Sequence, residues 1–203
     1  GMPDLNYRNP VVSAEAERIA EFWLREMNVD GFRLDAIRHL IEDGDVMTDT
    51  PETRAWLKGF QARLRKIEPD VLTVGEVWAS TEAVSEYIAE DALDLAFEFD
   101  LATAILDAAR TGTKAKLTYT LDNVAASYPA NRYATMITNH DQNRVASELG
   151  EGTARLKLAA GLLLTAPGVP FVYYGEEIGQ IGEKPDEMIR NPMPWSSAAH
   201  GGF

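Results

Sequence analysis

The sequence predicts an α/β fold in which helices flank a parallel β-sheet. Short runs rich in β-branched and aromatic residues alternate with segments of helical periodicity along the whole chain. No internal repeat or low-complexity linker divides the 203 residues, and 45% of them are hydrophobic, which is sufficient for one large core. Because five predicted strands alternate with helices, the sheet is either doubly wound or part of a barrel. In both cases functional side chains are expected at the carboxyl ends of the strands.

Capping residues, prolines and periodicity set the bounds of these elements. Asn9-Pro10 and Thr50-Pro51 each begin a helix, because Asn and Thr cap helix amino termini and proline suits the first turn. Pro69 prevents the second helix from continuing. The predicted strands are 31–35, 71–74, 93–99, 133–138 and 169–174, and the predicted helices are 9–28, 50–67, 82–90, 101–110 and 153–164.

Two segments differ from this regular pattern. Residues 153–164 are apolar almost all round, which predicts a buried helix. Residues 111–131 show no periodicity that assigns them to a helix or a strand.

The composition excludes several classes of function. Lys and Arg number 19 against 32 Asp and Glu, and a net charge of -13 would repel a phosphate backbone, so we expect no nucleic-acid partner. The chain has no cysteine, which excludes disulfides, thiolate metal sites and cysteine nucleophiles. No apolar run approaches the length of a membrane span, so we expect no membrane partner. The compartment cannot be inferred from the sequence.

Carboxylates follow several of the predicted strands. One carboxylate can attack an acetal carbon while another protonates the leaving oxygen, so acids clustered with an arginine and a histidine suit glycosidic chemistry. A structural alternative stays open, in which Asp35 forms an ion pair with Arg33 and Glu76 caps the next helix. The side chains concerned are Arg33, Asp35, Glu76, His140, Asp141, Glu176 and Glu177.

Five segments resemble motifs of the α-amylase family of glycoside hydrolases, and they occur in the family's order. Together they identify the chain as a member of that family. The segments are Met2-Pro-Asp-Leu-Asn6, Gly31-Phe-Arg-Leu-Asp-Ala-Ile-Arg-His39, Val74-Gly-Glu-Val-Trp78, Thr138-Asn-His-Asp141 and Pro167-Gly-Val-Pro-Phe-Val-Tyr-Tyr-Gly-Glu-Glu177.

The resemblance implies a partial (β/α)8 TIM barrel that covers about strands 4 to 8, with residues 1–203 as one partial catalytic domain. Strands one to three, the family's inserted domain and its C-terminal β-domain are expected to be absent from the chain. An open piece of a barrel would expose strand edges and the apolar interior face. We therefore expect a homo-oligomer that forms through those edges.

The resemblance also implies the roles of the acids. Asp35 is expected to be the nucleophile of a retaining mechanism, and Glu76 the general acid and base. Asp141 is expected to be the third carboxylate, which holds sugar hydroxyls together with His140. Arg33 lies two residues before Asp35 on a strand, hence on the same side, and is expected to keep it ionised.

Three further residues are expected to bind substrate. Arg38 and His39 match a pair that lines the leaving-group side in the family, although solvated surface is the alternative. Trp78 is expected to stack on a sugar, and ordinary packing is its alternative. Arg190 matches the arginine of a further family motif, Arg190-Asn-Pro-Met-Pro-Trp195. Calcium is implied only for the complete enzyme, with the His39 carbonyl as one ligand; we expect no metal ligands among the side chains and no other cofactor.

Two hypotheses of function follow from these expectations. The first is retaining hydrolysis of α-1,4-glucosidic bonds in starch, maltodextrin or related α-glucans. The second is a non-catalytic fragment or associating module derived from such an enzyme. The presence of all three expected catalytic acids favours the first.

Overall fold

The computed structural model describes residues 5–150 and 152–202. Residues Met2 to Asp4, which begin the first family-like motif, lie outside the described residues. The chain forms two compact units. The first contains the chain up to Phe97 together with Ser127–Ala134, and the second contains Glu98–Ala126 and the chain from Thr135 onward.

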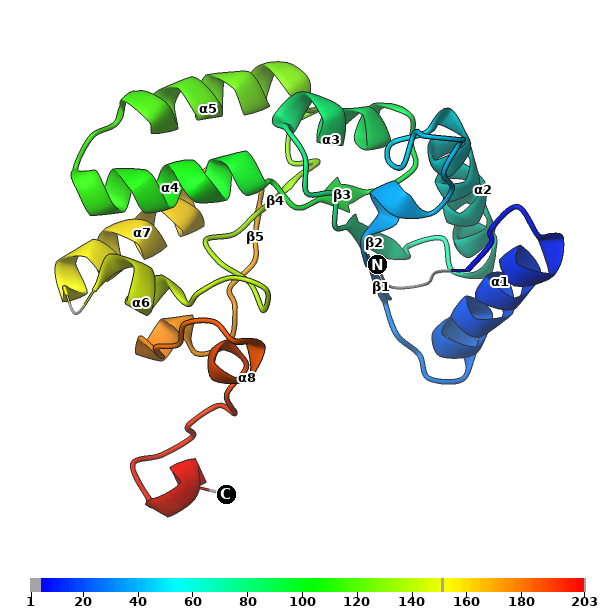
Figure 1. Ribbon diagram of the computed structural model, residues 1–203. Coiled ribbons are helices and arrows are strands. Elements are labelled where there is room, and N and C mark those ends of the chain that lie inside the picture. The colour runs from blue at the N-terminus through cyan, green and yellow to red at the C-terminus, as the bar shows by residue number, and fades with distance from the viewer. Residues whose placement is uncertain (1–4, 151, 203) are drawn as a thin grey trace. The chain divides into compact units, whose positions relative to one another are not determined.

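The first unit is built on a three-stranded parallel sheet with the order β1-β2-β3 (Figure 1). Helices lie between successive strands in the chain, as a parallel sheet requires. The elements are α1 (Pro10–Arg25), β1 (Gly31–Leu34), the 3-10 helix η1 (Ile37–His39), α2 (Pro51–Ile67), β2 (Leu72–Gly75), α3 (Thr81–Ala89) and β3 (Leu95–Ala96).

The predicted helix starts are confirmed. The Asn9 side chain accepts a hydrogen bond from the Val11 amide, and Pro10 is the first helical residue of α1. The Thr50 hydroxyl accepts one from the Thr53 amide, and Pro51 begins α2. Each cap satisfies an amide that has no partner within its helix.

A close approach of two backbones sets the register of β1 against β2. Gly31 pairs with Leu72, and the pairing continues until Leu34 meets Gly75. A Cβ atom added to Gly31 would lie 2.0 Å from the Leu72 carbonyl oxygen, so a larger residue would force the strands apart. This register places the residues that follow the two strands next to one another.

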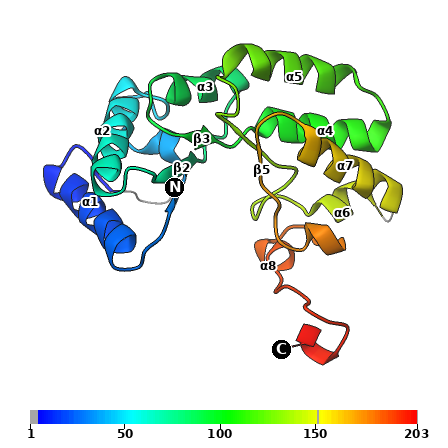
Figure 2. The same ribbon diagram turned by 180° about the vertical axis from the view of Figure 1, so that it is seen from behind.

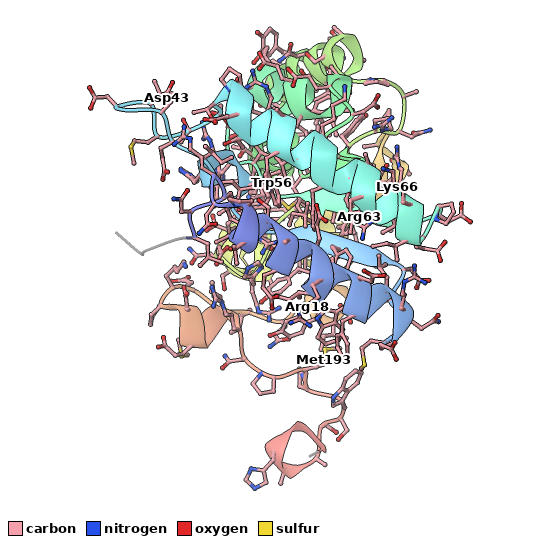
Figure 3. The ribbon with its side chains drawn as sticks, turned by 90° about the vertical axis from the view of Figure 1, so that its right-hand side faces the viewer. Arg18, Asp43, Trp56, Arg63, Lys66 and Met193 are labelled. Atoms are coloured by element: carbon pink, nitrogen blue, oxygen red, sulfur yellow. The ribbon has the colours of Figure 1, made fainter. Side chains whose placement is uncertain are left out.

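α1 and α2 pack together over β1 (Figure 3). Trp56 stacks on Phe60 at a centroid distance of 5.0 Å, and its indole nitrogen donates a 2.8 Å hydrogen bond to the Ser13 hydroxyl. Figure 3 shows Trp56 and Arg63 between the two helices. The buried residues of this cluster are Ala20, Leu24, Phe60, Leu64 and Val71.

Several large apolar side chains of α1 lie outside this core. Ile19, Phe22 and Trp23 are each more than 40% exposed, whereas Ala20 and Leu24 are the buried residues of the helix. The exposed residues line a shallow pocket of about 310 Å³ together with Arg18. The first unit therefore presents an apolar helix face to solvent.

The second unit is mainly helical. α4, α6 and α7 lie together in both views (Figures 1 and 2), and β4 pairs with β5 in a separate two-stranded sheet. α5 lies within residues 111–131, which the sequence pattern did not assign to a helix or a strand. The elements after β3 are α4 (Phe99–Thr111), α5 (Ala115–Ser127), β4 (Ala134–Thr135), α6 (Val145–Leu149), α7 (Thr153–Thr165), β5 (Val169–Pro170), η2 (Glu176–Ile178), α8 (Asp186–Ile189) and η3 (Ala199–Gly202). The last residue of α5 and the first residue of β4 belong to the first unit.

The structure confirms an α/β fold with parallel strands and flanking helices, but the last three strands are shorter than predicted. Each contains two residues. β3 ends early because Glu98 caps the next helix, accepting hydrogen bonds from the amides of Asp100 and Leu101. An isolated parallel bridge joins Phe97 to Ala134. Closure into a barrel and the assignment of residues 1–203 to one domain stay predictions.

The prediction that residues 153–164 form a buried helix is wrong for most of that helix. In α7 only Ala159 and Leu163 are buried, while Leu158 and Leu164 are 47% and 61% exposed. One face of α7 packs on α4 and α6, and the other remains open. Elsewhere, none of the helices in the described parts of the chain combines the length and apolarity that crossing a membrane would require.

Asp94 connects α2, β2 and β3. Its Oδ2 accepts hydrogen bonds from the side-chain amide of Gln61 at 2.7 Å and from the Thr73 amide at 2.9 Å, and the Thr73 hydroxyl lies 3.1 Å away. Arg65 pairs with the other carboxylate oxygen. Burial acts to raise the pKa of Asp94, but the hydrogen bonds from Thr73 and Gln61 and the charge of Arg65 outweigh it, and the pKa is lowered.

Asp94→Ala should lower the free energy of unfolding by about 2–3 kcal/mol at pH 7, because it leaves buried donors unpaired. Because the pKa of Asp94 is lower in the folded chain than the unfolded value of about 3.9, the ionised carboxylate stabilises the fold above that pH. This stabilisation is lost as the pH falls through the folded-state pKa. The difference from the unsubstituted chain, measured by urea unfolding, should therefore shrink below about pH 4. Asp70→Ala, at an exposed position, is the control; equal effects of the two changes would contradict this role.

Candidate active site

Asp35 and Glu76 directly follow the neighbouring parallel strands β1 and β2. The register pairs Leu34 with Gly75, so the next residue on each strand is a carboxylic acid. The Glu76 amide donates to the Leu34 carbonyl over 2.9 Å, and Glu76 Oε2 accepts a 2.7 Å hydrogen bond from the Ala36 amide. These contacts bring the two acids side by side at the carboxyl end of the sheet.

Arg33 contacts Asp35 from the same face of β1. Residues two apart on a strand share a face, and Arg33 Nη1 donates a hydrogen bond to Asp35 Oδ1. The Asp35 side chain is 74% exposed, so a molecule in solvent can reach it. Asp35 is thus both oriented by a guanidinium and accessible, which is what a carboxylate nucleophile requires.

The backbone turns sharply immediately after Asp35. Ala36 has a φ of 45°, in the left-handed region that residues other than glycine seldom adopt. The turn directs the Ala36 amide to the Glu76 carboxylate and the Ile37 amide to the Glu76 carbonyl, at 3.3 Å. Backbone strain of this kind often accompanies functional sites.

Arg38 fixes the segment that contains Trp78. Its guanidinium donates to the Trp78 carbonyl and to Asp49 Oδ2, and Asp49 Oδ1 accepts a 2.7 Å hydrogen bond from the Tyr87 hydroxyl. Burial, reinforced by Asp49, raises the pKa of Tyr87 above its ordinary value, so that hydroxyl remains a donor. These contacts give Arg38 a structural role. The substrate-binding role that the sequence predicts for it stays a prediction.

A pocket of about 240 Å³ lies beside Glu76. Trp78 is 50% exposed and forms part of its wall, where an aromatic ring is available to stack on a sugar face. The structure thus brings together four of the predicted site residues around this pocket. Its lining residues are Ala36, Arg38, His39, Glu76 and Trp78.

His140 and Asp141 lie together in the second unit, where Arg190 holds both. Arg190 Nη2 is 2.6 Å from Asp141 Oδ1, and Arg190 Nε donates a 2.8 Å hydrogen bond to the His140 carbonyl. His140 Nε2 is 3.3 Å from Asp141 Oδ2. The Asp141 amide donates to the Asn139 side chain over 2.9 Å, so a local turn shapes the loop. The motif containing Arg190 is therefore structurally tied to the predicted third carboxylate.

Glu176, which the sequence placed at a strand end, lies next to the same loop. Its Oε1 accepts a 2.7 Å hydrogen bond from the Thr138 hydroxyl, and its Oε2 accepts one of 3.3 Å from the Tyr173 amide. Glu177, the next residue, is exposed. The two neighbouring acids thus have different surroundings.

The calcium site implied by the resemblance has no support from the side chains in the structure. Among the described residues, no three His, Asp or Glu side chains are grouped so that they could hold a metal ion.

Sequence reasoning missed two residues of these networks. Asp49 contacts Arg38 and Tyr87, the latter 38 residues away, and no local pattern signals such a contact. Arg144 is buried three residues after Asp141. A buried arginine so close to a predicted site residue is recognisable only once its burial is known.

The comparisons with known proteins agree with this arrangement of motifs. The family model described as the α-amylase catalytic domain matches residues 1–203. Alpha-amylase 3 of Dictyoglomus thermophilum is 39% identical over 199 residues, covering 96% of this chain and 38% of the relative. A 4-alpha-glucanotransferase of Thermotoga maritima is 34% identical over 204 residues, covering 97% and 42%.

Solved structures show the same similarity. The crystal structure of an α-amylase from H. orenii matches with a TM-score of 0.85 and 36% identity, over 98% of this chain and 41% of that chain. The chain thus spans about two fifths of the length of these relatives. With a family model that matches along its whole length and relatives above 30% identity, the chain belongs to the α-amylase family of glycoside hydrolases.

Proposed function

We propose that this chain supplies the catalytic carboxylates of a retaining hydrolase that cleaves α-1,4-glucosidic bonds in starch, maltodextrin or related α-glucans. The adjacency of Asp35 and Glu76 at the ends of paired parallel strands is the observation that supports this most strongly. Neighbouring strands are about 4.8 Å apart. That spacing suits the roughly 5–5.5 Å between the two carboxyl groups of a retaining glycosidase.

In the proposed reaction, Asp35 attacks the anomeric carbon while Glu76 protonates the departing glycosidic oxygen. The bond between carbon and leaving oxygen breaks, and a covalent glycosyl ester forms on Asp35. Glu76, now a carboxylate, removes a proton from water, which attacks the same carbon and releases Asp35. Two inversions leave the configuration of the product unchanged.

The remaining predicted residues bind and orient the sugar in this proposal. Arg33 orients the nucleophile, while Asp141 and His140 bind the hydroxyls of the cleaved unit. Arg38, His39 and Trp78 line the pocket beside Glu76, which is the side of the leaving group. The proposed partner of all these residues is the α-glucan substrate.

A transferase reaction is the second candidate, because one of the relatives is a 4-alpha-glucanotransferase. The same glycosyl ester would then react with a sugar hydroxyl in place of water. Chromatography of the products from maltopentaose distinguishes the two, since transfer produces chains longer than the substrate. A third alternative is a non-catalytic module, which an assay of the chain with a chromogenic maltoside tests directly.

Asp35→Asn should reduce turnover by on the order of 10⁴-fold while leaving binding of maltooligosaccharides largely intact, because it removes the nucleophile. The change is best measured in a graft in which this chain replaces the matching segment of the Dictyoglomus thermophilum relative. Asp30→Asn, at the opposite end of β1, is the matched control. Substantial activity of the Asp35→Asn graft would contradict the assignment.

Glu76→Gln should show a different pattern, because it removes the proton donor but keeps the nucleophile. Substrates whose leaving group needs little protonation, such as an α-glucosyl fluoride, should be spared at the first step far more than maltopentaose. The measurement is the ratio of the two rates in the same graft. If both substrates lose activity equally, Glu76 is not the general acid.

We also propose that the chain by itself associates with a second copy through the strand edges and the apolar surface that an open piece of a barrel exposes. The face of α1 formed by Ile19, Phe22 and Trp23 is one exposed apolar surface of this kind. Sedimentation at micromolar concentration should show a dimer or a larger species, and Trp23→Glu should shift it toward the monomer. Tyr119→Glu, which alters an exposed aromatic residue of α5, is the control. A stable monomer of the unsubstituted chain would refute self-association.

A further inference from the structure

The loop that contains Asp141 is fastened on both sides to one short segment, Tyr173–Glu176. Three residues before Asp141, the buried Thr138 hydroxyl donates a 2.7 Å hydrogen bond to Glu176 Oε1. Three residues after Asp141, the buried Arg144 donates a 2.6 Å hydrogen bond to the Tyr174 carbonyl. These two contacts, one on each side of Asp141, tie the loop to that segment.

Aromatic rings hold the Arg144 side chain. Its guanidinium carbon lies 4.5 Å from the centroid of the Tyr173 ring and 4.6 Å from that of the Tyr174 ring. Its Nε and Nη2 have no hydrogen-bond partner among the described residues. The two rings therefore contribute cation–π stabilisation to this buried charge, and the charge also acts on Glu176 nearby.

The same two tyrosines also position the segment around Arg190. The Tyr173 hydroxyl donates to the Ile189 carbonyl over 3.0 Å, and the Tyr174 hydroxyl donates to the Asn191 carbonyl over 2.7 Å. These are the residues on either side of Arg190, which pairs with Asp141. The Tyr173–Glu176 segment thus supports both partners of that ion pair.

A glycine makes the turn that presents Glu176. Gly175 has a φ of 84°, and a Cβ atom there would lie 2.1 Å from the Gln180 side-chain oxygen. Both facts disfavour any larger residue. The turn returns the chain so that the Tyr173 amide reaches Glu176 Oε2, which leaves Oε1 directed at Thr138.

We propose that Glu176 is a positioning residue for Asp141: its contact with Thr138 sets the place of the loop 139–141, and a change in its charge moves that loop. The functional consequence rests on the proposed role of Asp141 in sugar binding. Glu176 itself does not touch the substrate in this proposal.

The surroundings of Glu176 make its charge sensitive to pH near neutrality. Burial raises the pKa of Glu176 to about 7, although hydrogen bonds from Thr138 and Tyr173 and the charge of Arg144 act in the opposite direction. Burial also raises the pKa of Tyr173, whose ring contacts Arg144, to about 12. His140 is the remaining titratable group on the loop apart from Asp141.

The direct test is an NMR titration of the amide shifts of residues 139–141 in the chain between pH 5 and 9. His140→Gln is the background, so that the imidazole does not contribute. We expect a titration step near pH 7 that Glu176→Gln abolishes, because glutamine resembles the protonated acid and cannot ionise. The amide shifts of the chain that carries both Glu176→Gln and His140→Gln should match those of the His140→Gln chain at low pH.

Glu177→Gln is the matched control, since it removes the adjacent exposed carboxylate, and the step should persist. A step that persists in Glu176→Gln, or the absence of any step in the parent, would overturn the inference. This outcome does not depend on activity, so it is separable from failure of the proposed function.

A kinetic comparison in the graft tests the functional consequence. Thr138→Val and Glu176→Ala should each lower kcat/KM roughly 10- to 100-fold, as expected for small displacements of a group that binds the transition state. The double variant should lose little more than the worse single variant, because both changes break one contact. Thr138→Ser, which keeps the hydroxyl, should restore activity. Additive losses, or no rescue by serine, would count against the proposal.

Discussion

The parallel pairing of β1 with β2 is the constraint on which the candidate site depends. The absence of a side chain at Gly31 lets the β1 backbone approach the Leu72 carbonyl, and the resulting register continues to the far end of both strands. Asp35 and Glu76 are adjacent only because they are the next residues after that paired end. A slip of one residue would turn one of the two acids toward the opposite face.

Packing behind the sheet keeps this arrangement in place. α1 and α2 cover β1 with a cluster of buried apolar side chains, and Asp94 joins α2 to β2 and β3 through hydrogen bonds. Two of the predicted site residues are accessible instead, because the Asp35 side chain is 74% exposed and Trp78 is half exposed. The predicted site residues of the first unit thus lie at an exposed edge of the sheet, over a packed interior.

Local signals in the sequence were sufficient for the helix starts and for the order of the motifs. Asn9-Pro10 and Thr50-Pro51 specify their helices within a few residues, and the structure has both. Periodicity failed for 153–164, because an apolar sequence does not say which faces find a partner. Contacts between distant residues, such as Asp49 with Tyr87 or Thr138 with Glu176, leave no local pattern. They depend on the tertiary fold and required the structure.

The central claim is that Asp35 forms a covalent bond to the sugar, and trapping that bond tests it most directly. A fluorinated α-glucosyl fluoride can form the ester faster than the ester hydrolyses. The graft with the Dictyoglomus thermophilum relative would be incubated with this reagent, digested and analysed by mass spectrometry. We expect one glycosyl group on the peptide that contains Asp35, and none on the Asp35→Asn variant. A label on Glu76 or Asp141, or hydrolysis that inverts the anomeric configuration, would contradict the proposed mechanism.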